Sequence, residues 1–313
     1  MTDYPTAPWP LPLPQGDEPP NPPLSVWPTG QRDHAAQLRD SGCVPGTETD
    51  TDQIPPAIAA HAIATYTHPG ELVLDPDCGT GTVLTEALRA GRHSVGLTAR
   101  SRWWSIARAN ITAAKRDGAW RDGSVLDARP RALATIRAAG LIGRVGLVLT
   151  ALRTATGDDT NGPDRDLDSA FRDLAATLTY CEPLVRSGGH LVVVARPRRH
   201  PDGSLVDLTT PLIAAAASAG LAAVERCVAL TAGLRGGRLV TRASFAERRA
   251  AARARAGGSP VALVAHHEVI VFQLAHDAEL AAAAALGTPL SADAGVPRPA
   301  VNGVEYRGWR RAA

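Results

Sequence analysis

The segment ELVLDPDCGTGTVLTEAL (residues 71–88) joins a short apolar run, a turn with two glycines and an amphipathic run. This pattern predicts a strand that ends at Asp75, a tight turn through Gly79 and Gly81, and a helix after it. A turn without side chains lets a ligand lie against the backbone at the helix N-terminus. Because G-x-G alone is more often an ordinary strand-to-helix turn, the rest of the chain must decide between these interpretations.

Short apolar runs and amphipathic stretches alternate on both sides of this segment. We expect strands over 71–75, 93–98, 123–127, 145–150, 190–195, 221–231 and 266–274, and helices over 55–67, 81–90, 101–116, 130–139, 167–186, 208–219, 243–256 and 277–286. Such alternation predicts an α/β fold with a mostly parallel, seven-stranded sheet and helices on both faces. The last two strands lack a full crossover between them, so one of them is expected to run antiparallel at the edge.

The ends of the chain differ in texture from this α/β region. The first 28 residues hold ten of the 25 prolines, which predicts an extended and partly disordered arm over residues 1–53. The α/β domain is expected over residues 54–275. Residues 276–313 begin with an Ala-rich helical stretch and end in a flexible Gly/Pro-containing tail.

Composition sets broad limits on the class of protein. The chain has 313 residues, 44% of them hydrophobic, and a net charge of +2, which neither favours nor excludes a polyanionic partner. No apolar run reaches membrane-spanning length, and the four cysteines lack metal-ligand spacing. We therefore expect a soluble, cytoplasmic protein without a metal site. Lys115 is the only lysine, so the abundance of arginine is attributed to coding bias and is only weak evidence of phosphate binding.

The octapeptide DPDCGTGT (residues 75–82) is more specific than its glycines alone. It resembles the first motif of the S-adenosylmethionine-dependent DNA methyltransferases that modify exocyclic amino groups of adenine or cytosine. The segments GHLVVVARPRR (189–199) and HHEVIVFQ (266–273) are also similar to those of actinobacterial members of this family. The resemblance covers residues 24–274 and implies a Rossmann-like class I methyltransferase fold.

This resemblance also assigns expected roles to individual residues. Asp75, Cys78, Gly79 and Gly81 would surround the methionine part of S-adenosylmethionine. Asp127, after the third strand, would lie near the adenine, although an Asp that caps a surface helix is an equally good interpretation. The family usually carries an acid at the end of the second strand, where this chain has Thr98. Loss of that acceptor of ribose hydrogen bonds is expected to weaken cofactor binding by about 1–3 kcal/mol.

The largest departure from the family follows the fourth strand. Family members carry Asp, Asn or Ser, then Pro-Pro, then an aromatic residue, which accept the hydrogens of a flipped base amine and stack on its ring. The matching positions here are Ala151, Leu152, Arg153 and Thr154. The acceptor, both prolines and the ring are missing, so this catalytic motif is degenerate and no catalytic residue is predicted.

A second departure lies before the first helix of the domain. Relatives have a His-Pro-containing stretch that helps to close the cofactor pocket, whereas this chain reads TETDTDQIPP (47–56). We expect a solvated loop there and assign no role to Asp50 and Asp52.

Two basic segments are candidates for binding nucleic acid. Arg196, Arg198 and Arg199 follow the fifth strand, at the rim where open α/β sheets bind ligands. The second segment, from residue 235 to 255, has one acid, Glu247, and seven arginines, at 235, 238, 242, 248, 249, 253 and 255. This segment is either a phosphate-binding face or a solvated helix surface.

Three functions remain open from the sequence. The first is a degenerate DNA methyltransferase that still binds S-adenosylmethionine, with reduced affinity, is catalytically weak or inactive, and serves as a nucleic-acid-binding or regulatory partner of an active relative. The second is an active methyltransferase, on DNA or another acceptor, with a rearranged site. The third is a fold that is retained without a ligand.

Overall fold

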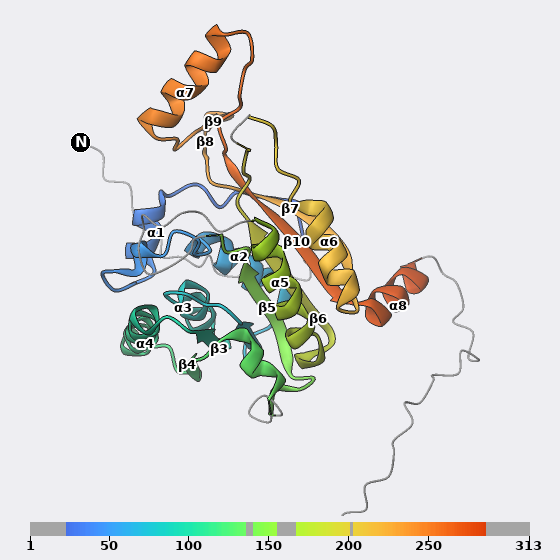
Figure 1. Cartoon of the computed structure of the whole chain (residues 1–313). Helices are drawn as coiled ribbons and strands as arrows, with labels where there is room; N and C mark the ends of the chain where they lie inside the picture. Colours follow the sequence, from blue (N-terminus) through green and yellow to red (C-terminus); the bar gives the residue numbers. More distant parts are fainter. Residues whose placement is uncertain (1–22, 136–139, 155–166, 201–202, 286–313) are drawn as a thin grey trace, which may run out of the picture.

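The computed structural model describes residues 23–135, 140–154, 167–200 and 203–285 (Figure 1). Eight strands form one sheet in the order β1-β7-β10-β6-β5-β2-β3-β4. Their bounds are β1 Val26–Trp27, β2 Leu72–Asp75, β3 His93–Thr98, β4 Gly123–Asp127, β5 Val145–Ala151, β6 Val185–Ala195, β7 Leu221–Leu230 and β10 His266–Leu274. A separate pair is formed by β8 (Gly233–Arg235) and β9 (Arg238–Val240).

The helices alternate with these strands along the chain. The α-helices are α1 His34–Asp40, α2 Pro56–Tyr66, α3 Thr82–Arg89, α4 Ser101–Arg116, α5 Leu167–Cys181, α6 Thr209–Ser218, α7 Phe245–Ala256 and α8 Ala275–Ala285. Short 3-10 helices are η1 Thr47–Thr49, η2 Pro130–Ala134 and η4 Glu182–Leu184.

The strand directions define the fold class. Strands β4, β3, β2, β5 and β6 are parallel neighbours, and β10 runs antiparallel to both β6 and β7. This mixed, mostly parallel sheet with helices on both faces is the class I methyltransferase fold. The fold class predicted from the sequence is confirmed.

Two details of the predicted sheet are wrong. The sheet has eight strands within the described residues rather than seven, because β1 adds to β7 through Val26 and Trp27. The antiparallel strand β10 is not at the edge; it lies between β6 and β7. Four consecutive residues of β10 are completely or almost completely buried: Val269, Ile270, Val271 and Phe272. Such burial requires packed layers on both faces of the sheet and a neighbouring strand on each side.

The N-terminal arm predicted over residues 1–53 is too long. Residues 1–22 lie outside the described residues, but residues 23–53 contain β1, α1 and η1, which belong to the folded domain. Trp27 is completely buried, and its ring packs 4.6 Å from that of His61 and 6.4 Å from that of Tyr66.

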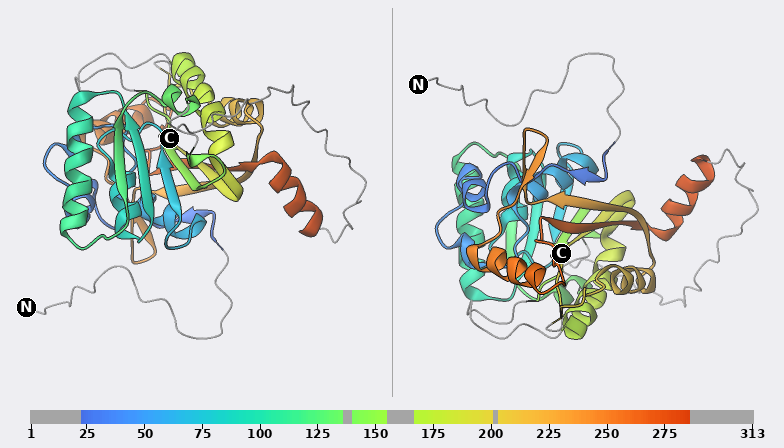
Figure 2. Two further views of the ribbon diagram at one scale, coloured as in Figure 1. Left: turned by 90° about the horizontal axis from the view of Figure 1, so that it is seen from below. Right: turned by 90° about the horizontal axis from the view of Figure 1, so that it is seen from above.

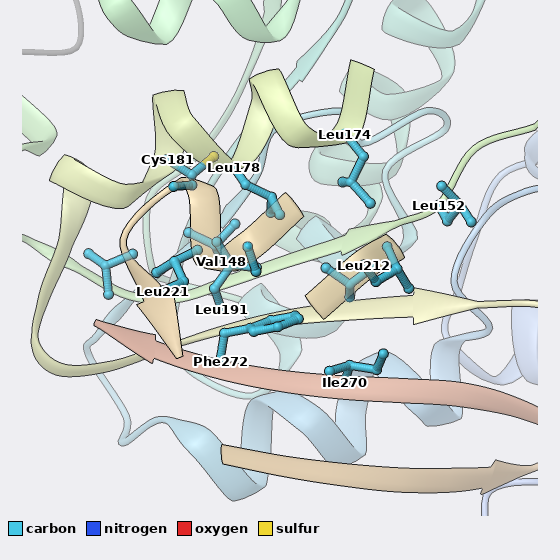
Figure 3. Packing of buried hydrophobic residues seen from close by; sticks show 14 of the residues in the cluster. Val148, Leu152, Leu174, Leu178, Cys181, Leu191, Leu212, Leu221, Ile270 and Phe272 are labelled. Carbon is cyan, nitrogen blue, oxygen red and sulfur yellow. The ribbon is translucent and has the colours of Figure 1, made fainter. Parts of the chain in front are cut away.

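Alternate residues of the central strands face two separate cores. Val148, Leu191, Val193, Ile270 and Phe272 pack against α5 and α6 in the cluster that Figure 3 shows. The intervening residues of the same strands pack with α2 and α3 on the other face. Figure 2 shows the resulting three layers, with α8 projecting from one end of the sheet.

Helix boundaries differ from prediction where proline and glycine intervene. The helix predicted over 167–186 ends at Cys181, and the 3-10 helix η4, which begins at Glu182 and contains Pro183, separates it from β6. The helix predicted over 130–139 is a 3-10 helix from Pro130 to Ala134, and residues 136–139 lie outside the described residues. The other predicted strands and helices agree with the structure to within two residues at each end, apart from β6, which begins earlier, at Val185.

This topology brings four candidate segments to one edge of the sheet. The parallel strands β2, β3, β5 and β6 end there, and each is followed by residues singled out in the sequence. The hairpin β8–β9 and the helix α7 stand beyond the same edge (Figure 1).

Candidate functional site

The glycine-containing turn has the predicted form. Strand β2 ends at Asp75, α3 begins at Thr82, and Gly79 and Gly81 have φ values of 52° and 86°. A Cβ on Gly81 would lie 3.0 Å from that of Ala107, so α4 also approaches the turn closely. We refer to residues 75–82 as the cofactor loop. Its four predicted residues, Asp75, Cys78, Gly79 and Gly81, therefore lie together on one turn.

The bare face of Gly79 is covered by an ion pair within the protein. A Cβ on Gly79 would overlap both Asp50 Oδ2 and Arg153 Nη2. Arg153 donates from Nη1 to Asp50 Oδ1 at 2.8 Å and from Nη2 to Asp50 Oδ2 at 3.1 Å. Thr80 N–H donates to the same Oδ2 at 3.2 Å. The space that the glycine leaves is thus used by two side chains of this chain.

The guanidinium of Arg153 is fixed from other directions as well. Its Nε donates to the carbonyl oxygen of Asp77 at 2.8 Å, and the ring of Trp103 lies 5.3 Å from its central carbon. The Arg153 side chain is only 8% exposed and that of Asp50 is fully buried. A planar guanidinium that pairs in two places with one carboxylate is the strong, directional form of this interaction.

Charges at this edge shift the pKa values of two groups in opposite ways. Burial alone lowers the pKa of Arg153, but attraction by Asp50 and Asp77 outweighs it, so the pKa lies above its ordinary value. Burial raises the pKa of Asp75 to about 8, with the positive charge of Arg153 opposing the rise. Asp75 is therefore mainly protonated at neutral pH, while Arg153 keeps its charge.

The rest of the segment after β5 is also held by the protein itself. Leu152 is buried in the core beside α5 (Figure 3). Thr154 N–H donates to Asp52 Oδ2 at 2.6 Å, and its hydroxyl oxygen accepts a hydrogen bond from Arg198. Ala151 is the last residue of β5 and is half-buried.

The expectation of a solvated loop at Asp50 and Asp52 is wrong for Asp50. Its residue exposure is 1%, because η1 folds the segment back onto the cofactor loop. Asn110 fastens the two together, since its Nδ2 donates to Thr80 O at 2.8 Å and to Thr47 Oγ1 at 2.9 Å. Sequence reasoning missed Asn110, Trp103 and the role of Asp50. The one available signal was a charged Arg153 directly after an apolar strand.

Thr98 and Asp127 end neighbouring strands, and their Cα positions pair in register. Thr98 is buried, and its hydroxyl has no hydrogen-bond partner among the described residues. Asp127 is exposed. Asp75 and Cys78 are buried, and Cys78 packs in the apolar cluster beneath α3 and α4, where burial raises the pKa of its thiol well above its ordinary value.

These positions test whether the site fits S-adenosylmethionine. The backbone of the cofactor loop has the shape that such a ligand needs, but Asp50 and Arg153 cover Gly79. At the two further positions where contacts were predicted, Thr98 carries no charge and Asp127 faces solvent. The residues as they stand do not fit the methionine end of the cofactor.

The three arginines after β6 do not form one surface. Arg196 and Arg199 are exposed, and Arg199 Nη1 donates to the carbonyl oxygen of Gly203 at 3.0 Å. Arg198 is half-buried because it reaches back to Thr154. The charge of Arg196 is one of the smaller causes that lower the pKa of Glu247, so the N-terminal turn of α7 lies nearby.

Helix α7 carries the second basic segment. It has no buried residue, and a capping box formed by Ser244 and Glu247 starts it. Four arginines of α7 are exposed: Arg248, Arg249, Arg253 and Arg255. Arg242, before the helix, donates to the carbonyl oxygens of Gly30 and Gln31 and so joins the segment before α7 to the segment after β1. Arg196, Arg199 and α7 together make the basic surface at this edge.

Two other features are absent from the part of the chain that the structure describes. No group of three His, Cys, Asp or Glu side chains within the described residues is arranged to hold a metal ion. Within the same residues, no helix has the length and apolar character needed to cross a membrane.

Comparison with known families places the N-terminal third in context. Residues 15–108 match a family described as DNA methylase, a range that covers less than a third of the chain. The matched range contains Asp50 and the cofactor loop and ends before β5. A search of curated proteins found no match.

Several solved structures are similar in fold. TrmN from Thermus thermophilus has a TM-score of 0.45 at 16% identity, over 76% of this chain and 53% of that chain. A SAM-dependent methyltransferase from Agrobacterium tumefaciens has a TM-score of 0.44 at 16% identity, over 71% of this chain and 63% of that one. Geranyl diphosphate methyltransferase in complex with SAM has a TM-score of 0.46 at 15% identity, over 79% and 97%. The present chain thus spans about half the length of TrmN.

Proposed function

We propose that this protein is a DNA-methyltransferase-like protein that does not methylate base amines and acts as a nucleic-acid-binding or regulatory partner. The observation that carries the proposal is the state of Ala151–Thr154. Leu152 is in the core, the Arg153 guanidinium is bound to Asp50, and the Thr154 hydroxyl is bound to Arg198.

The chemistry of base amines explains why this arrangement matters. An exocyclic amine shares its lone pair with the base ring, so it becomes nucleophilic only when acceptors hold its hydrogens and a ring holds the base. Arg153 has five N–H donors and no acceptor, so it cannot bind such an amine. Thr154 has the only other polar side chain among residues 151–154, and none of these four residues is aromatic.

Affinity for S-adenosylmethionine belongs to the same proposal. The match to DNA methylases includes the cofactor loop, and the loop keeps its backbone form. Binding is weak or absent in the native protein, because Asp50 and Arg153 cover Gly79 and Thr98 replaces a charged acceptor.

A nucleic acid is the partner that the exposed charges favour. Arg196 and Arg199 lie at the carboxyl edge of the sheet, and four exposed arginines of α7 extend the basic surface. Such a surface neutralises phosphates without reading sequence. A catalytically active relative that brings its own methyl-transfer site would supply the chemistry in a regulatory complex.

Methyl transfer tests the proposal directly. The protein is purified from a host without DNA methyltransferases and incubated with radiolabelled S-adenosylmethionine and DNA, RNA or cell extract. We expect no label in adenine or cytosine, with an active amino-methyltransferase as positive control. Labelled adenine or cytosine from the protein alone overturns the proposal, and label in another acceptor assigns the active, rearranged alternative.

A further inference from the structure

We propose that the cofactor loop contains a carboxylate-binding site whose resident ligand is the side chain of Asp50. A free carboxylate-bearing molecule binds there only after Asp50 is removed or displaced. The inference rests on the proposed function, because that proposal identifies the side of the cofactor loop that faces a ligand.

The donors of this site converge on one point. Thr80 N–H donates from the loop immediately before α3, and two nitrogens of Arg153 donate from the segment after β5. Both oxygens of the Asp50 carboxylate are thereby bound: Oδ1 by Arg153 and by the N–H of Asp52 in its own segment, and Oδ2 by Arg153 and Thr80. An amide N–H ahead of a helix together with a guanidinium is a set of donors suited to a carboxylate.

The donors are fixed independently of Asp50. Arg153 Nε is bonded to the carbonyl oxygen of Asp77, and Trp103 lies against the guanidinium. Thr80 is fixed through its carbonyl oxygen by Asn110. Removal of the Asp50 side chain therefore leaves these groups in place with their unused hydrogens directed at a common point.

The acceptor, in contrast, comes from a separate segment of the chain. Asp50 follows η1, and the segment around it is also joined to the cofactor loop through Thr47, which accepts from the Thr80 hydroxyl, and Ile54, which accepts from the Thr82 hydroxyl. The face of Gly79 that Asp50 covers has no side chain of its own. A carboxylate that replaces Asp50 would lie against this glycine, as a ligand of the loop does.

The donors determine the first part of the ligand, which is a monoanionic carboxylate. The proposed function supplies the second part: the carboxylate belongs to an amino acid that is attached to a nucleoside, and the nucleoside would lie along the cofactor loop. S-adenosylhomocysteine carries such an amino acid, and 5′-methylthioadenosine has the same nucleoside without it. These two compounds separate recognition of the carboxylate from recognition of the nucleoside.

The first experiment uses formate, the smallest carboxylate, and needs no nucleoside. Melting temperatures are compared in about 0.2 M sodium formate and in sodium chloride at the same pH. We expect Asp50→Ala to melt about 2–4 °C higher in formate than in chloride. The wild-type protein and the double variant Asp50→Ala/Arg153→Met are expected to show no such difference.

Two further variants provide a control with a closed site and a replacement if Asp50→Ala does not fold. Asp50→Asn keeps the shape of the side chain and still covers Gly79, so it is expected to gain nothing from formate. Asp50→Ser keeps an acceptor for Thr80 and opens the site, so it is judged by the same formate-minus-chloride difference if Asp50→Ala is insoluble. Equal melting temperatures in the two salts for every opened variant overturn the proposal, as does an equal gain in the double variant.

The second experiment measures the nucleoside ligands by calorimetric titration. We expect Asp50→Ala to bind S-adenosylhomocysteine at least tenfold more tightly than the wild type does, with no comparable change for 5′-methylthioadenosine. An equal gain in affinity for both compounds, or weaker binding of S-adenosylhomocysteine by Asp50→Ala than by the wild type, contradicts the carboxylate site. A formate effect without nucleoside binding retains the carboxylate site and removes the cofactor part of the proposed function, so the two failures are distinguishable.

Discussion

Arg153 and Asp50 are 103 positions apart in the sequence, and their side chains meet in a buried, two-point ion pair at 2.8 and 3.1 Å. The pair joins the segment after β5 to the segment before α2, over the face of Gly79. This one interaction commits the guanidinium after β5 to Asp50 and covers the face of Gly79, so neither group is open to another ligand.

Removing one member of this pair is predicted to destabilise the protein strongly. Arg153→Ala leaves the Asp50 charge buried without its partner, and Asp50→Ala does the same to Arg153, so each is expected to cost about 3–5 kcal/mol of unfolding free energy. The double variant Asp50→Ala/Arg153→Ala is expected to cost less than the sum of the two single losses. Urea unfolding of the four proteins measures this coupling.

The surface pair of Arg32 and Asp40 provides the matched control. Its side chains are 63% and 52% exposed, although its bidentate geometry is similar, with both hydrogen bonds at 3.0 Å. Arg32→Ala is expected to cost less than about 1 kcal/mol. Additive losses for Asp50 and Arg153, or losses no larger than that of Arg32→Ala, would show that the buried pair is not the structural clamp described above.

Asp75 is predicted to make stability depend on pH. Burial raises its pKa from 3.8 to about 8, so the folded protein holds a proton that the unfolded chain releases. Its contribution to stability is complete below about pH 4 and is lost as pH rises through about 8. Relative to Asp75→Asn, which cannot ionise, the wild-type free energy of unfolding is expected to fall by up to about 1.4 kcal/mol per pH unit in this window.

Urea unfolding of the wild type and Asp75→Asn at pH 5, 7 and 9 provides the measurement. The difference between the two proteins isolates Asp75 from other titrating groups, such as His267, whose pKa is lowered to about 4 mainly by burial. A difference that stays constant from pH 5 to 9 contradicts a protonated Asp75 in the folded state.

The fold was predictable because its signals are local. Alternating apolar periods placed most strands and helices, and the glycines at 79 and 81 placed the turn between β2 and α3. The hairpin β8–β9 was overlooked, although Gly236 and Gly237, both with positive φ, are typical of a two-residue hairpin turn. The run VIVF at 269–272 likewise indicated a central strand rather than an edge strand.

The residue types of the site could be identified from the sequence, but their contacts could not. Ala151, Leu152, Arg153 and Thr154 follow a recognisable strand, but no periodicity or spacing connects Arg153 with Asp50. A charged residue in an otherwise buried segment requires a partner somewhere, and the choice among 31 acidic residues depends on the tertiary fold. Thr98, Asp75 and Gly79 were placed at the correct edge for the same reason that the fold was.

Trp27 is predicted to be essential for stability, because it connects the N-terminal segment to the domain. Its side chain is completely buried beside α2, so Trp27→Ala is expected to cost about 3–5 kcal/mol in urea unfolding. Trp120, which is 72% exposed, is the matched control, and Trp120→Ala is expected to cost less than about 1 kcal/mol. Equal losses for the two variants would mean that β1 is not an integral strand.

The basic surface is predicted to bind DNA through Arg196 and Arg199 and not through Arg198. Replacing the two exposed arginines with alanine is expected to weaken DNA retention and to reduce the slope of log K against log salt by about 2, since each lost phosphate contact accounts for about 0.9. Arg198→Ala is expected to lower the melting temperature with little change in that slope, because its side chain holds the hydroxyl of Thr154.

Filter binding or fluorescence anisotropy at several salt concentrations measures these slopes, with Arg116→Ala as control because that exposed arginine lies at the far end of α4. Alanine at Arg248 and Arg249 tests the extension onto α7, where a further decrease in slope is expected if the helix contacts phosphates. An unchanged slope on α7 assigns that helix to solvent. An unchanged slope for Arg196 and Arg199 as well removes this edge from DNA binding, since exposed arginines that neutralise phosphates must release counterions.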